Sequence, residues 1–190
     1  MNNLNNPVFG RRGYVQTFYG MGKGKTVASI GTAFRALGQG WKVLLIMLVK
    51  GKDLDDVRFY GEVNTIKDRT QTSEFRVEQF GVDDVLYYGN LTDDIVENLK
   101  IGWEFAKQSI MDGQYDLIIL DEINVVMDMG VIDNDEIIRT IKRKPSHVEI
   151  VCTGRPKIPE LIEISDLVTE MRCVKHYYRK NIKARRGIEY

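Results

Sequence analysis

Gly20-Met21-Gly22-Lys23-Gly24-Lys25-Thr26 joins an apolar run over 14–19 to a helical pattern over 25–37. Glycine permits the backbone turns that point successive amide N–H groups at one anion. A helix N-terminus adds partial positive charge, Lys25 adds a full charge, and Thr26 offers a hydroxyl suited to Mg²⁺. The fit to G-x-x-x-x-G-K-[ST] is imperfect, because Tyr19 stands five residues before Gly24. Because the lysine, strand and helix are all in register, we predict a phosphate loop that binds a polyphosphate.

Apolar strand-like runs alternate with amphipathic helical patterns on both sides of this loop. The predicted strands cover 14–19, 42–49, 116–120 and 148–153, and the predicted helices cover 25–37, 93–111 and 131–142. The inward stripe predicted for the first helix is Val27, Ile30, Ala33, Phe34 and Leu37. The inward stripe predicted for the second is Ile95, Leu99, Trp103, Ala106 and Ile110. This alternation predicts an α/β fold with a mainly parallel sheet flanked by helices, whereas residues 53–92 give no firm pattern.

The composition indicates one soluble globular domain, with 43% hydrophobic and 28% charged residues among 190. We expect a flexible N-terminal segment over 1–13 and a single nucleotide-binding domain over 14–190. The longest apolar run, 43–49, is far shorter than the roughly 20 residues that span a bilayer. Two cysteines, Cys152 and Cys173, lack metal-ligand spacing and suggest reduced thiols. These features predict a cytoplasmic protein without a membrane partner.

The net charge of zero hides an uneven distribution. Residues 1–52 carry eight basic and no acidic side chains, and residues 112–136 carry eight acidic and no basic ones. Residues 172–190 carry seven basic side chains against Glu189, a run that solvated surface explains equally well. The basic run around the Gly/Lys loop favours an anionic ligand. Because nucleic-acid binders are more often basic overall, polyphosphate fits better than a nucleic acid.

A second apolar run, 117–120, ends in the two carboxylates Asp121 and Glu122. A nucleotide-bound Mg²⁺ needs hard oxygen ligands, and parallel strands deliver side chains at their carboxyl ends. Consecutive strand residues point to opposite faces, so we expect one carboxylate to bind or orient the metal and the other to support it. Taken alone, acids that end a strand are also a common structural feature.

Three stretches of the sequence resemble the ATP:corrinoid adenosyltransferase family. The first runs from Gly22-Lys23-Gly24-Lys25-Thr26 through 31–40 to Lys50-Gly51. The second is Leu120-Asp121-Glu122-Ile123-Asn124. The third is the ending, with Thr153-Gly154-Arg155, 161–171, Val174-Lys175-His176 and Gly187-Ile188-Glu189-Tyr190. Together they cover about 14–52 and 115–190, and the shortened phosphate loop is itself similar to the pattern of this family.

The resemblance implies a RecA-like P-loop NTPase fold, a homodimer, and transfer of the 5′-deoxyadenosyl group of ATP to Co(I) of a reduced corrinoid. It implies catalytic roles for Lys25 and Glu122, and Mg²⁺ or Mn²⁺ held by Thr26, Glu122 and Asp121. It further implies an electron-donating flavoprotein as a partner. The ATP contacts that it implies are Gly20, Met21, Gly22, Lys23, Gly24, Lys25, Thr26, Val27, Arg35 and Arg155.

The middle of the chain departs from the family. Where the family places a Phe-x-Trp pair against the corrinoid, this sequence has Leu86 and Tyr88, which we take as the candidate corrinoid site. Residues 53–85 are also longer than the usual segment. Two other classes therefore stay open at this point. One is a small RecA-like ATPase or kinase, and the other is a regulatory module that binds a nucleotide without turnover.

Overall fold

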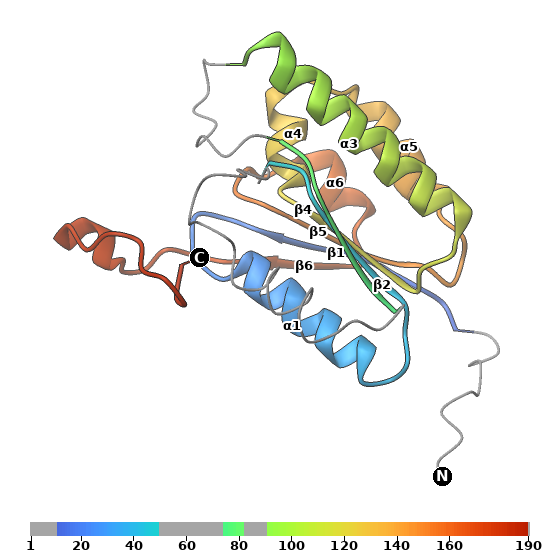
Figure 1. The fold of residues 1–190 in the computed structure, drawn as a ribbon, viewed down its shortest axis with the longest axis horizontal. Coiled ribbons are helices and arrows are strands. Elements are labelled where there is room, and N and C mark those ends of the chain that lie inside the picture. The colour runs from blue at the N-terminus through green and yellow to red at the C-terminus, as the bar shows by residue number, and fades with distance from the viewer. Residues whose placement is uncertain (1–10, 50–73, 82–90, 190) are drawn as a thin grey trace.

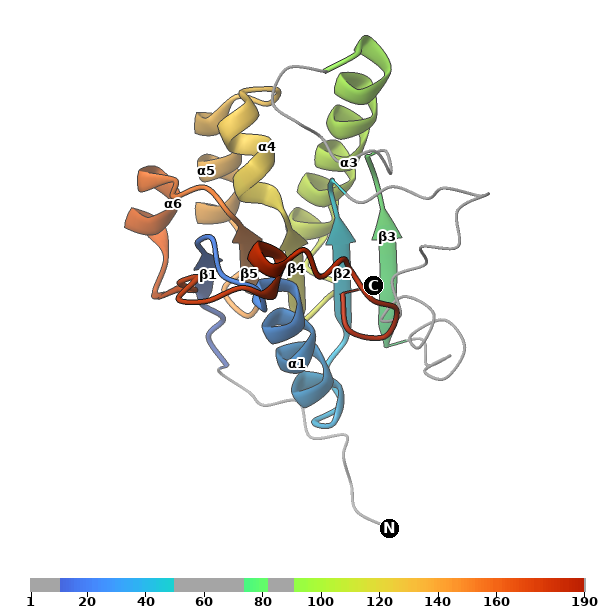
Figure 2. The same cartoon turned by 90° about the vertical axis from the view of Figure 1, so that its left-hand side faces the viewer.

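The computed structural model describes residues 11–49, 74–81 and 91–189. Within these residues six strands form one parallel sheet in the order β3-β2-β4-β5-β1-β6, most of which Figure 2 shows side by side. The strands are β1 Val15–Tyr19, β2 Val43–Met47, β3 Phe75–Gln79, β4 Leu117–Asp121, β5 Glu149–Gly154 and β6 Leu167–Glu170. This arrangement confirms the predicted α/β class with a parallel sheet.

Helices cover both faces of the sheet (Figure 1). The helices are α1 Lys25–Leu37, α3 Asp93–Asp112, α4 Ile123–Met129, α5 Asn134–Lys142, α6 Pro159–Ile164 and the 3₁₀ helix η1 Tyr177–Lys180. Helix α1 packs on one face, and α3, α4, α5 and α6 pack on the other. No helix in the described part of the chain is both long and apolar enough to cross a membrane.

The central strands supply side chains to two hydrophobic cores. In β2, Leu44 and Ile46 join the core beneath α3–α6, whereas Val43, Leu45 and Met47 join the core beneath α1. All five are fully buried, as expected for strands of a parallel sheet covered on both faces. Each such side chain contributes about 1.5–3 kcal/mol of burial free energy, so the two cores hold the sheet between its helices.

The predicted inward stripe is right for α3 and partly wrong for α1. The five apolar residues predicted to face inward on α3 are all buried. On α1, Ile30 and Ala33 are buried, but Val27 is 66% and Phe34 is 45% exposed. The buried face of α1 is instead centred on small residues and Lys25, the latter drawn inward at the phosphate loop. Val27 therefore faces solvent, whereas the partly exposed Phe34 packs its ring edge-on against Phe75 of β3.

Five elements were not predicted from the sequence, namely β3, β6, α4, α6 and the 3₁₀ helix η1. Strand β3 lies within the segment that gave no firm pattern, and β6 is an exposed edge strand paired with β1. The helix predicted over 131–142 begins only at Asn134, because the side chain of Asp133 accepts a hydrogen bond from the Asp135 N–H and caps it. Residues 131–133 are not helical, and a separate short helix, α4, ends before them at Met129.

The end of the N-terminal segment contacts the body of the domain. Residues 1–10 lie outside the described part, so the flexibility predicted for 1–13 stays a prediction. The Arg11 guanidinium donates to the Asp116 carbonyl oxygen at 2.9 Å and lies 3.1 Å from the centroid of the Trp41 ring. The Gly13 N–H donates to the Ser146 carbonyl oxygen at 2.7 Å. Both contacts lie at the amino end of β1.

The two cysteines differ in burial, and this difference predicts their reactivity. Cys152 on β5 is fully buried, and burial raises the pKa of its thiol to about 12, whereas Cys173 is partly exposed. The buried Cys152 thiol therefore stays protonated near neutral pH, whereas the thiolate is the reactive form. We therefore expect iodoacetamide to label Cys173 alone in the native protein and both cysteines in denaturant, as measured by peptide mass spectrometry. Labelling of native Cys152 at the rate of Cys173 would contradict the buried position of β5.

Candidate nucleotide site

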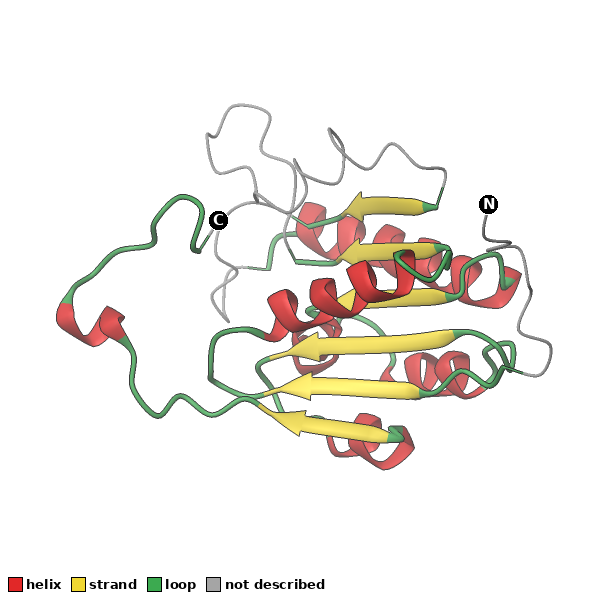
Figure 3. Cartoon of the chain, turned by 90° about the horizontal axis from the view of Figure 1, so that it is seen from below, coloured by secondary structure: helices red, strands yellow, loops and turns green. Residues whose placement is uncertain are grey.

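The phosphate loop lies at the carboxyl ends of the strands, between β1 and α1 (Figure 3). Gly20 and Gly24 have φ values of 112° and 115°, in the left-handed region that favours glycine. A Cβ atom at Gly20 or Gly22 would lie 2.5 Å or 2.7 Å from the carbonyl oxygen of Met171. These two glycines are therefore required by the close approach of the chain after β6.

Lys25 is buried inside the loop rather than extended into solvent. Only 7% of the residue is exposed, and its ammonium donates to the carbonyl oxygens of Gly20 and Gly22 at 2.7 and 2.8 Å. The loop backbone thus surrounds the positive charge of Lys25, and the two hydrogen bonds from this side chain help to hold the loop in shape. A bound polyphosphate would offer charged oxygen acceptors to the same ammonium, and hydrogen bonds to charged partners are the stronger kind.

The carboxylate at the end of β4 is tied to the loop through two hydroxyl groups. Asp121 is fully buried, and its Oδ1 accepts from Thr26 Oγ1 at 2.8 Å and from Thr153 Oγ1 at 2.7 Å. Thr153 also accepts from the backbone N–H of Glu122 at 3.0 Å. Because β5 lies between β1 and β4, it brings Thr153 to both acidic residues. The pair Asp121–Thr26 therefore lies beside the phosphate loop, as the sequence predicts.

Glu122 has a backbone conformation that is unusual for a residue with a side chain. Its φ of 65° and ψ of 20° lie in the left-handed region, where it forms the N-cap of α4. A non-glycine residue there costs about 1–3 kcal/mol and persists only where neighbouring contacts hold it. The bond to Thr153 is one such contact. Asp121 therefore belongs to the extended strand, whereas Glu122 lies in the turn that begins α4.

The donor groups at this edge fit a nucleotide-bound divalent cation. The Thr26 hydroxyl and the Asp121 carboxylate are hard oxygen donors within 2.8 Å of each other. In the described residues no three His, Cys, Asp or Glu side chains form a cluster that could hold a metal by itself. A cation here would take its remaining ligands from phosphate oxygens and water, which is how Mg²⁺ is usually bound.

The other predicted ATP contacts lie at different distances from the loop. Arg155 follows β5, with its side chain exposed and its carbonyl oxygen accepting from the Gly20 N–H at 3.2 Å. Arg35 is exposed in the last turn of α1, about 15 Å along the helix axis from Lys25. Met21 and Val27 are 67% and 66% exposed. The structure gathers the loop, Thr26, Asp121, Glu122 and Arg155, but leaves Arg35 at the far end of α1.

Two residues near the loop, Thr153 and Asn124, had no role assigned from sequence. Thr153 supports both acids, and the fully buried Asn124 donates from Nδ2 to the Pro156 carbonyl oxygen at 2.9 Å. A Cβ at Gly154 would lie 2.4 Å from the Asn124 Cβ, so glycine is required there. The sequence signal for this position was Thr153-Gly154 directly after an apolar strand, but the residues that Thr153 contacts depend on the order of the strands in the sheet.

Leu86 and Tyr88, the candidate corrinoid site, lie outside the described residues.

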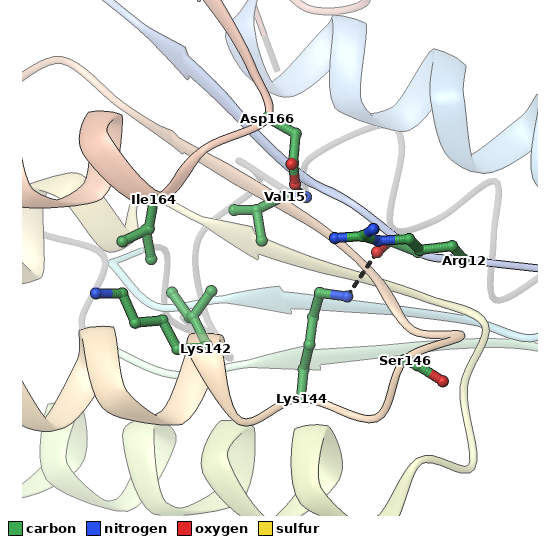
Figure 4. A pocket seen from close by; sticks show the side chains of 9 residues that line it. Arg12, Val15, Lys142, Lys144, Ser146, Ile164 and Asp166 are labelled. Atoms are coloured by element: carbon green, nitrogen blue, oxygen red, sulfur yellow. Dashed lines mark hydrogen bonds between the residues drawn. The ribbon is translucent and has the colours of Figure 1, made fainter.

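A separate cavity of about 540 Å³ opens at the opposite end of the strands, next to the amino end of β1 (Figure 4). Its lining residues are Arg12, Gly13, Val15, Ile141, Lys142, Lys144, Ser146, Ile164 and Asp166. Burial lowers the pKa of Lys144, whose ammonium donates to the Gly13 carbonyl oxygen at 2.7 Å. The Asp166 carboxylate accepts from the Val15 N–H at 2.9 Å. These polar groups stabilise the amino end of β1, away from the phosphate loop.

Known proteins resemble this chain over most of its length. The family described as ATP:corrinoid adenosyltransferase BtuR/CobO/CobP matches residues 11–190. The corrinoid adenosyltransferase of Escherichia coli K12 is 30% identical over 179 residues, which cover 94% of this chain and 86% of that protein. An uncharacterized protein of Nostoc sp. is 33% identical over 181 residues, covering 86% of this chain. This chain spans only 45% of the length of the Nostoc protein.

A solved structure shares the fold. The flagellar accessory protein FlaH of Methanocaldococcus jannaschii matches with a TM-score of 0.58 and 15% sequence identity, covering 84% of this chain and 71% of that chain. At this identity the likeness concerns the fold alone. It agrees with the six-stranded parallel sheet and confirms the predicted RecA-like P-loop fold.

The contacts of Thr153 predict an unusually costly loss of one hydroxyl group. Thr153→Val keeps the shape but leaves Asp121 and the Glu122 N–H each without one buried partner, so we expect unfolding free energy to fall by about 2 kcal/mol. Chemical denaturation would measure it. Thr140→Val is the matched control, because Thr140 is also buried but bonds only to a carbonyl within its own helix. Equal losses in the two variants would contradict the supporting role of Thr153.

Proposed function

The chain belongs to the ATP:corrinoid adenosyltransferase family, and from that premise we propose that it transfers the 5′-deoxyadenosyl group of ATP to Co(I) of a reduced corrinoid, releasing triphosphate. The observation that carries the proposal is the phosphate loop curled around the buried Lys25 ammonium, beside the Asp121–Thr26 pair. Such a site is suited to an anion with several phosphates.

The proposed reaction needs charge stabilisation rather than a protein base. Co(I) is a strong nucleophile that attacks the 5′-carbon of ATP, forming a cobalt–carbon bond while the bond from that carbon to the triphosphate oxygen breaks. The leaving group is the whole triphosphate, on which negative charge develops. Amide N–H groups of the loop and the Lys25 ammonium would stabilise this charge, as pre-organised donors do at other developing anions.

A divalent cation is part of the proposal. Thr26, Asp121 and Glu122 are the residues that would hold or orient Mg²⁺ or Mn²⁺ with the nucleotide. The cation would supply further neutralisation of charge on the phosphates. The Thr26–Asp121 bond supports this assignment, because it brings two hard oxygen donors together next to the loop.

Further parts of the proposal rest on the resemblance to the family. They are a homodimer, a flavoprotein that supplies electrons for Co(I), a cytoplasmic location, and corrinoid binding by Leu86 and Tyr88. The contacts of Arg35 and Arg155 with ATP belong here as well. Arg35 lies in the last turn of α1, so its side chain would have to extend along the helix to reach a nucleotide bound at the loop.

Product analysis tests the proposed activity directly. The protein is incubated with ATP, Mg²⁺ and chemically reduced corrinoid under anaerobic conditions, and the absorbance change of cobalt–carbon bond formation is followed. We expect this change together with inorganic triphosphate as the released product. ADP and phosphate would indicate an ATPase, ADP and a phosphorylated acceptor a kinase, and ATP binding without any product a regulatory module. Each of these three results would contradict adenosyl transfer.

The position of Lys25 predicts the effect of removing its charge. Lys25→Met keeps most of the stem but removes the ammonium, and the loss of charge-assisted contacts should weaken ATP binding by about 10- to 100-fold. Calorimetric titration would measure the dissociation constant. Lys100→Met, on the exposed side of α3, is the matched control and should bind ATP like the unchanged protein. Because Lys25 also bonds to loop carbonyls, thermal unfolding of both variants should be recorded alongside.

A further inference from the structure

The side chain of Lys23 is turned away from the interior of the phosphate loop. Its ammonium donates to Glu189 Oε1 at 2.6 Å, to the Ile188 carbonyl oxygen at 2.9 Å and to the Tyr177 hydroxyl at 3.2 Å. All three acceptors belong to residues 172–189, which we call the C-terminal tail. An ammonium has three N–H donors, so these bonds use its full capacity. Lys23 is thus engaged by the tail, in contrast to the neighbouring Lys25.

Glu189 is the centre of this contact. Besides Lys23, its carboxylate accepts from the Tyr177 hydroxyl and, at 2.7 Å, from the backbone N–H of Arg185. The Arg185 guanidinium lies 4.9 Å from the centroid of the Tyr177 ring. The hydrogen bond from Lys23, followed by the one from Tyr177, holds the pKa of Glu189 well below its usual value. The carboxylate therefore stays ionised throughout the neutral pH range. It connects Tyr177 and Arg185 within the tail and links the tail to Lys23 of the loop.

The rest of the tail is weakly packed. It extends beyond the carboxyl ends of the strands (Figure 3), and Val174, Tyr178 and Ile188 are 90%, 74% and 56% exposed. Just before the tail begins, the Met171 carbonyl oxygen accepts from the Gly22 N–H at 2.7 Å. The end of the tail is held by Glu189 on Lys23. Two consecutive loop residues, Gly22 and Lys23, are thus pinned by the two ends of the same C-terminal segment.

This geometry has a consequence for the binding of phosphate. A loop rich in glycine loses much conformational freedom when it is ordered around an anion, and that loss opposes binding. Contacts that order the loop beforehand reduce this cost. Lys23 lies between Gly22 and Gly24, so an external anchor at Lys23 restrains a part of the loop where glycine allows wide backbone freedom.

We propose that Glu189 is a positioning residue of the nucleotide site, which acts through Lys23 to hold the phosphate loop in its binding conformation under the C-terminal tail. The Lys23 ammonium then binds the C-terminal tail, and only the Lys23 backbone N–H is left to donate to the phosphates. This inference rests on the proposed function, because it takes ATP as the ligand of the loop. It makes the C-terminal tail, which is distant in sequence from the phosphate loop, a part of the ATP site.

A double-mutant cycle tests the proposal on the full chain. Glu189→Gln, Lys23→Met and the double variant are compared for ATP affinity by calorimetry. We expect each single variant to weaken ATP binding by about 5- to 10-fold, and the double variant to be no weaker than either, because all three remove the same contact. Glu163→Gln, an exposed carboxylate on α6, is the matched control and should leave affinity unchanged.

Two further readouts separate positioning from a general loss of structure. The KM for ATP should rise in Glu189→Gln while kcat at saturating ATP changes less than about twofold, because loop ordering is a binding term. Trypsin should cleave the tail of Glu189→Gln faster than that of the unchanged protein, at sites such as Arg179, Lys183 and Arg186. The thermal midpoint should be unchanged, since the tail packs little against either core.

Opposite signs in the cycle would overturn the proposal. If Lys23→Met weakens ATP binding while Glu189→Gln strengthens it, then Lys23 leaves the tail to bind phosphate and Glu189 competes with the ligand. Affinity in Glu189→Gln equal to that of the Glu163→Gln control would also overturn it. If the unchanged protein itself fails to bind ATP, the proposed function is at fault. The trypsin comparison without ATP then still reports whether Glu189 holds the tail.

Discussion

One buried carboxylate oxygen connects three parts of the candidate nucleotide site. Asp121 Oδ1 accepts hydrogen bonds from Thr26 at the start of α1 and from Thr153 at the end of β5. A carboxylate removed from water is costly unless such partners compensate it, so β4, β5 and the first turn of α1 must keep these relative positions. The strand order, with β5 between β1 and β4, satisfies this constraint. The left-handed turn at Glu122 depends on it in turn, since Thr153 also holds the Glu122 N–H.

The phosphate loop is shaped by the protein as well as by its ligand. Met171, just after β6, approaches Gly20 and Gly22 so closely that neither position has room for a side chain. Further along, Glu189 returns to the same loop and engages Lys23. The loop departs from the common G-x-x-x-x-G-K-[ST] pattern where the C-terminal segment packs against it. Loop and C-terminal segment therefore form one structural unit, although some 150 residues separate them.

The architecture suits a reaction in which the protein supplies position and charge. Lys25 is enclosed by loop carbonyls at the carboxyl edge of the sheet, where a triphosphate would meet backbone N–H groups and a helix N-terminus. A nucleophile as strong as Co(I) requires no activation by a side chain. The cavity at the amino ends of the strands is lined by Lys144 and Asp166, whose side chains hydrogen-bond to the backbone at the amino end of β1.

Local patterns in the sequence were sufficient for the parallel α/β class, the glycine-rich turn between β1 and α1, the acidic strand end and the inward face of α3, because each depends on neighbouring residues and on a short period. Only the tertiary structure decided three other features. They are the partial exposure of Phe34, the hydrogen bond from Thr153 to Asp121 and the contact of Lys23 with Glu189. These features depend on which strands are adjacent and on where the chain returns after β6. No local period encodes such long-range pairing, since it arises from packing two faces of one sheet and from compensating buried charge.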